Sequence, residues 1–131
     1  MWTVKNVVAV GLFLFGSTFL WMTPAFAGRT RPPTGMAWTV VNILALVAVA
    51  GFTVAAWAVF KQYSWWGSVT LVSAVIGLVA LIPFVFGLWQ IGVGFADLGV
   101  QINLWLHLVG SAAAVAVVLL PGIHAWVVHR F

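Results

Sequence analysis

The chain has 131 residues, of which 65% are hydrophobic and only 5% are charged. An ordinary soluble domain carries about 25% charged residues, so this composition excludes a water-facing globular surface. Five basic residues and one acid give a formal charge of +4. Nucleic-acid binding would require a basic patch or stripe, whereas these basic residues are scattered at the ends of apolar runs, as membrane topology and anionic headgroups favour. Cysteine is absent, which excludes disulfides and thiolate metal sites.

Four apolar runs occupy most of the chain. A helix rises about 1.5 Å per residue and the hydrocarbon core of a bilayer is about 30 Å thick, so one crossing needs about 20 apolar residues. The runs predict helices at approximately 4–23, 36–60, 68–95 and 100–120. We therefore expect an all-α, multi-pass integral membrane protein: a compact antiparallel bundle of four transmembrane helices with short connections, forming a single transmembrane domain over residues 1–131.

The first apolar run has two interpretations. It follows Lys5 and is followed by Ala25-Phe26-Ala27-Gly28, and a basic start, an apolar middle and an Ala-x-Ala site are also typical of a cleaved secretory signal. The run of about 16 apolar residues is slightly long for a signal core. We expect it to be retained as the first helix, with cleavage before Gly28 as the alternative that would leave three crossings.

The segments between the runs are short and carry turn and interface residues. Paired prolines, Pro32 and Pro33, mark a linker at 29–35, because proline lacks an N–H donor and disfavours helical geometry in the residue before it. The segment 61–67 contains three aromatic residues of the kind that settle at the headgroup boundary. Residues 121–131 follow the last run and are predicted to form a helical extension at the interface.

Orientation follows from the basic residues near the helix ends. Three fall on one predicted side and two on the other: Lys5, Lys61 and Arg130 against Arg29 and Arg31. Because Lys and Arg are enriched in cytoplasmic connections, this balance favours an N-terminus and a C-terminus on the same, cytoplasmic, side.

Small residues recur four positions apart in three of the predicted helices. Between membrane helices no hydrophobic effect drives association, so close backbone approach at small residues supplies packing energy. The pattern predicts helix-packing contacts at Gly51, Ala55, Ser73, Gly77, Gly110 and Ala114.

Four polar residues lie at similar depths when the distance of each from its predicted helix end is calculated. At helical rise, Asn42 and Gln90 lie about 10 and 8 Å inside one membrane face, and Asn103 and His107 about 5 and 10 Å inside the same face. Asn103, His107 and Ser111 are spaced by four and share one face of their helix. The sequence thus predicts a polar layer that spans three helices, with Asn42, Gln90, Asn103 and His107 as the candidate ligand-binding residues.

The polar layer has two interpretations. It could hold a polar headgroup, such as that of a quinone, a lipid, an ion or a haem edge, with His107 as the ionisable member. The alternative is hydrogen bonding between helices, contributing about 0.6 kcal/mol for each bond, which we favour. Asp97 is expected to serve as the N-cap of the helix at 100–120, where an acid stabilises the free N–H groups.

The histidines and acids offer no catalytic or metal arrangement. His107 and His124 are about 25 Å apart at helical rise, so one chain cannot clamp a haem between them. His124 and His129 are five residues apart, which is not the spacing of one helix face. Neither a nucleophile with a base and an orienting acid nor a glycine-rich phosphate loop can be assembled. We expect no enzymatic activity, and no cofactor is identified.

These features lead to two hypotheses of function. The first is a structural or accessory subunit of a larger membrane assembly, for example an energy-converting complex. Its partners would be the lipid bilayer and other membrane subunits or copies of the chain itself, with no nucleic acid. The alternative is a small homo-oligomeric ligand-binding or transport protein that uses the polar layer around His107.

Overall fold

The computed structural model describes residues 2–26 and 32–131. Within these residues the chain is all-helical and has no strand, which confirms the all-α part of the prediction. Two short 3-10 segments accompany the five α-helices: α1 (Val4–Thr18), η1 (Phe19–Met22), η2 (Pro24–Phe26), α2 (Met36–Phe60), α3 (Trp66–Gln90), α4 (Leu98–Leu119) and α5 (Pro121–Val128). Four spans are long and apolar enough to cross a membrane: Val4–Met22, Met36–Phe60, Trp66–Gln90 and Leu98–Leu119.

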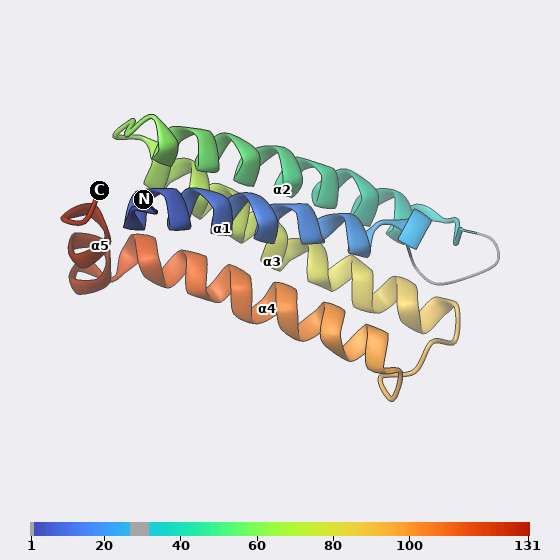
Figure 1. Cartoon of the computed structure of the whole chain (residues 1–131). Coiled ribbons are helices and arrows are strands. Elements are labelled where there is room, and N and C mark those ends of the chain that lie inside the picture. The colour runs from blue at the N-terminus through green and yellow to red at the C-terminus, as the bar shows by residue number, and fades with distance from the viewer. Residues whose placement is uncertain (1, 27–31) are drawn as a thin grey trace.

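The four long helices lie side by side, and the chain direction reverses from each one to the next (Figure 1). Helix α2 packs against both α1 and α3, and α3 packs against α4, whereas the backbones of α1 and α4 approach each other less extensively. The short helix α5 lies across the end at which α1 begins (Figure 1). The largest fully buried side chains of the apolar core are Trp38, Phe19, Phe52 and Met22.

The first crossing is a composite of an α-helix and a 3-10 turn. Thr3 caps α1 by accepting a hydrogen bond from the Asn6 N–H at 3.3 Å. The last turn tightens into η1 and stops at Thr23, whose extended backbone (ψ 154°) is the geometry expected before Pro24. The predicted helix at 4–23 therefore has its last turn in 3-10 form. Ala27, Gly28, Arg29 and Arg31 lie outside the described residues, which include the linker only from residue 32 on.

Helices α2 and α3 end in the same way. After α3, the Gly92 N–H donates to the Trp89 carbonyl at 3.1 Å and the Val93 N–H to the Leu88 carbonyl at 3.0 Å, with Gly92 at φ +70°. These are the two bonds of a Schellman cap. Gln62 takes the equivalent position after α2, at φ +59°.

The prediction of a third helix at 68–95 was wrong at both ends. The helix starts two residues earlier, at Trp66, and stops at Gln90. The apolar residues that follow Gln90 are part of a connection, because Gly92 lets the chain leave the helix in a left-handed conformation. The connection to α4 is consequently longer than the predicted 96–99.

The fourth helix begins and ends at clear local signals. The Asp97 carboxylate accepts a hydrogen bond from the Val100 N–H at 3.1 Å, which confirms the predicted N-cap. Leu120 leaves helical geometry (ψ 110°), and Pro121 then opens α5 at its first position, where its missing N–H costs nothing. The predicted extension at 121–131 is thus a separate helix, Pro121–Val128.

The outer surface is mainly apolar, and the interior contains few polar side chains. Large hydrophobic residues such as Ile82, Trp89 and Trp105 expose more than half of their area. The buried polar residues in the described part of the chain are Thr23, Thr70, Ser73, His107 and Ser111. Of these five, His107 alone is ionisable, so the candidate site is built around it.

Candidate polar site

His107 lies in the interior between α4 and the first crossing, with no exposed surface. Its Nδ1 is 2.7 Å from the carbonyl oxygen of Asn103, one turn earlier in α4. Because a carbonyl only accepts, Nδ1 is the donor. The Nε2 atom is 3.2 Å from the Thr18 hydroxyl at the end of α1. Both ring nitrogens therefore have partners within the protein.

The Thr18 hydroxyl has two acceptors within reach but only one proton. Its Oγ1 atom is 2.6 Å from the Phe15 carbonyl and 3.2 Å from His107 Nε2. When the imidazole is neutral and carries its proton on Nδ1, Nε2 is an acceptor, and the Thr18 proton is shared between it and the carbonyl. The contact joins α1 to α4, whose backbones approach each other less extensively than those of α1 and α2 or of α3 and α4.

Aromatic rings close the remaining space around the imidazole. The Phe19 ring centroid is 4.4 Å from that of His107, and the Phe15 centroid is 6.2 Å away. Phe19 itself has no exposed surface. The environment of His107 is thus filled by side chains of the same protein.

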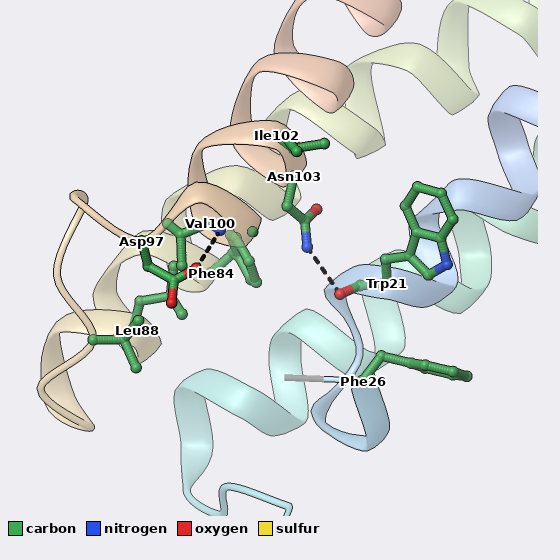
Figure 2. A pocket seen from close by; sticks show the side chains of 10 residues that line it. Trp21, Phe26, Phe84, Leu88, Asp97, Val100, Ile102 and Asn103 are labelled. Carbon is green, nitrogen blue, oxygen red and sulfur yellow. Dashed lines mark hydrogen bonds between the residues drawn. The ribbon is translucent and has the colours of Figure 1, made fainter. Parts of the chain in front are cut away.

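Asn103 makes a second tie between α4 and the first crossing. Its Nδ2 donates to the Trp21 carbonyl at 2.9 Å (Figure 2). Trp21 lies in η1, near the helix end where carbonyls lack partners within the helix. The Asn103 Oδ1 and Ser111 Oγ atoms are buried and accept no hydrogen bond among the described residues.

The structure brings together only part of the predicted polar layer. Asn103 and His107 are adjacent, and Ser111 is buried on the same side of α4. Asn42 is half-buried in α2, and Gln90 is exposed as the last residue of α3. Within the described residues, neither side chain hydrogen-bonds to Asn103 or His107. Gln90 also lies at the end of its helix and not about 8 Å inside it as predicted, because α3 stops there.

The partners of Asn103 and His107 come from the first crossing, which was not predicted to be part of the polar layer. Thr18 was the missing residue. The available signal was a hydroxyl near the end of an otherwise apolar run, at a depth similar to that of His107.

An open cavity of about 650 Å³ lies beside Asn103 at the end where α4 begins. Figure 2 shows Asp97, Leu88 and Phe84 on one side of it and Trp21 and Phe26 on the other. The remaining wall is formed by Val93, Gly99, Val100, Ile102 and Asn103. His107 does not line this cavity, so the open space and the buried imidazole are separate features.

Four of the six predicted small residues lie at close contacts, of two kinds. A Cβ added to Gly51 would meet Ser73 Oγ, so two predicted positions face each other between α2 and α3. Gly77 and Gly110 instead accommodate the rings of Phe19 and Phe15. Ala55 is fully buried and Ala114 almost so.

The other described histidines do not join His107. His124 in α5 stacks on Trp66 with ring centroids 5.4 Å apart and an angle of 7° between the planes. In the described part of the chain, no three His, Asp or Glu side chains are grouped so that they could hold a metal ion. No protein family, curated protein or solved structure matches the chain.

Proposed function

We propose that the chain is an integral membrane protein in which α1 to α4 form a compact antiparallel transmembrane bundle, with both termini on the cytoplasmic side. We further propose that it serves as a structural or accessory subunit of a larger membrane assembly. The bundle would contribute shape and contact surface and not a reaction.

The apolar outer surface supports membrane insertion. In water, contiguous exposed apolar patches larger than a few hundred Å² mark interaction sites or aggregation, whereas this chain exposes Trp, Phe, Ile, Leu and Val side chains on every long helix. In a bilayer these residues face lipid at no cost. Helix α1 begins and α5 ends at the same end of the structure (Figure 1). Lys5, Lys61 and Arg130 lie near those helix ends, which favours a cytoplasmic position for that end.

The closed environment of His107 carries the proposal of a structural function. Both ring nitrogens are engaged by Thr18 and Asn103, and Phe19 covers the ring. A ligand could reach the imidazole only by displacing Phe19 or separating α1 from α4. These contacts favour a structural function for the imidazole, in which it holds two helices together, over a function in ligand binding.

Purification from native membranes tests the proposal. The full chain, tagged at one end, would be extracted in a mild detergent and analysed by blue-native electrophoresis and mass spectrometry. We expect stable, stoichiometric membrane partners that survive a salt wash. A species made of this chain alone, obtained in several mild detergents, would overturn the accessory function. Release of the chain from membranes by alkaline carbonate would overturn membrane insertion.

The alternative is a homo-oligomeric ligand-binding or transport protein, and one observation favours it. The cavity of about 650 Å³ beside Asn103 falls in the size range of small-molecule sites, about 300–1,000 Å³. Its polar groups are Asn103 and Asp97. A small molecule that copurifies with the intact chain and is lost from Leu88→Trp, which would fill the cavity, would favour this function over the first.

A further inference from the structure

Two lysine side chains converge on one phenylalanine at the end of the structure where α1 begins. Lys5 lies in the first turn of α1, and its Nζ is 5.7 Å from the centroid of the Phe60 ring. Lys61 is the C-cap of α2, and its Nζ is 6.0 Å from the same centroid. Lys61 also lies 4.8 Å above the Trp57 ring. Two cations from different helices therefore share the Phe60 ring, at distances where a cation is attracted to an aromatic face.

A groove of about 260 Å³ opens beside Phe60. Its walls are Trp2, Asn6, Ala9, Val10 and Phe60. Four of these are apolar, and Asn6 adds an amide whose side chain makes no hydrogen bond within the described residues. The groove is therefore apolar along its length, with an amide and two ammonium groups near it.

The charged side chains around this groove are of one sign. Asp97 is the only acidic side chain in the sequence, and it lies at the start of α4, at the opposite end of the bundle (Figure 1). A negatively charged ligand would thus meet Lys5 and Lys61 without an opposing acidic side chain. Because ammonium groups bind phosphate as point charges, a phosphate is the group that the two lysines fit.

We infer that this groove binds one acidic phospholipid. The phosphate lies near Lys5 and Lys61, where the Asn6 amide can donate to it, and an acyl chain follows the surface formed by Ala9, Val10 and Phe60. The inference rests on the proposed membrane insertion, and the positive-inside orientation would place the groove in the leaflet that carries anionic lipids. The apolar groove favours a lipid over free phosphate, which would leave those side chains uncovered.

Arg130 provides a matched control. Its guanidinium carbon is 4.4 Å from the centroid of the Trp126 ring, on α5 at the same end of the structure. It is likewise a cation over an aromatic ring, but its ring, Trp126, does not line the groove, whereas Phe60 does. If acidic lipids were attracted only by the total charge of this end, removing Arg130 would weaken them as much as removing a lysine.

The test is lipid retention by the purified full chain, measured by native mass spectrometry after equilibration with mixed phosphatidylglycerol and phosphatidylcholine. We expect one tightly held phosphatidylglycerol. Lys5→Gln and Lys61→Gln should each lower its retention about fivefold, since a lysine near an anionic surface contributes about that factor. Arg130→Gln should change it less than twofold. Val10→Trp, which fills the groove without changing the charge, should abolish retention.

Several results would overturn the inference. Equal effects of Arg130→Gln and Lys61→Gln would show a diffuse charge effect. Equal retention of phosphatidylcholine would show that charge has no part, and displacement by millimolar inorganic phosphate would show a free-anion site. Unchanged retention in Val10→Trp would place the lipid elsewhere. Before the lipid measurement, each variant must have the same melting temperature as the wild type when no lipid is added. Loss of lipid selectivity in a chain that resists carbonate extraction refutes only this inference, whereas extraction of the chain refutes the proposed function.

Discussion

Two glycines of α1 offer a direct measurement of how tightly α1 packs on α2. A Cβ added to Gly16 would collide with Phe52 Cβ and would lie 3.2 Å from Cγ and 3.6 Å from Cα of the same residue. A Cβ added to Gly11 would have no atom within 4 Å. Both glycines lie inside the same α-helix, so changing either to alanine brings the same gain in helix propensity, about 0.8–1 kcal/mol. The difference between Gly16→Ala and Gly11→Ala is therefore the steric cost alone.

The expected difference is about 1–3 kcal/mol, the usual cost of overpacking a well-packed interior. The clash is with a Cβ attached directly to the α2 backbone, which cannot rotate away, so the two helices must separate. Packing contacts are the main source of association energy between membrane helices. Unfolding would be followed by circular dichroism during titration with dodecyl sulfate in mixed micelles. A difference below about 0.5 kcal/mol, the range of ordinary surface substitutions, would refute this account of the α1–α2 contact.

Three further sets of variants test single features by the same unfolding assay. His107→Leu and Thr18→Val should each cost about 1 kcal/mol, and the double variant less than their sum by about 0.6 kcal/mol; strict additivity would exclude a bond between them. Asp97→Ala should cost about 1 kcal/mol, whereas Asp97→Asn should cost little because asparagine caps equally well; equal losses would point to the charge. Gly92→Ala should cost about 1 kcal/mol for its left-handed backbone, whereas Gly122→Ala, also in open space but within α5, should not; an equal result would refute the backbone explanation.

The helices could be predicted from hydropathy, but their exact ends could not. Hydropathy reports only how apolar each side chain is. The residues just after Gln90 are mostly apolar, like those before it, so hydropathy does not mark the end of the helix. What ends α3 is the backbone freedom of Gly92. The glycines at positions 92 and 94 were the sequence feature that could have indicated the end of this helix. At Gln62, a left-handed residue without such a signal, the end of α2 was located only because polar residues follow it.

The shared helix face of the polar site could be predicted, but the helix that this face meets could not. Counting 1.5 Å per residue gives the height of a side chain along its helix, and spacing by four correctly grouped Asn103, His107 and Ser111. Neither rule says which neighbouring helix that face meets. The partner proved to be Thr18 on the first crossing, whereas Asn42 and Gln90 make no hydrogen bond to this face. Which helices are neighbours depends on packing contacts along their whole length.

The glycines that receive aromatic rings also bear on how this sequence can vary. The ring of Phe15 occupies the place where a side chain at Gly110 would lie, and the ring of Phe19 does the same at Gly77. Each pair joins the first crossing to a helix far away in the sequence. A larger residue at either glycine therefore requires its phenylalanine ring to move away or to be replaced by a smaller side chain. Related chains should therefore change these positions as pairs, and a library that randomises one member alone should return almost only the original residue.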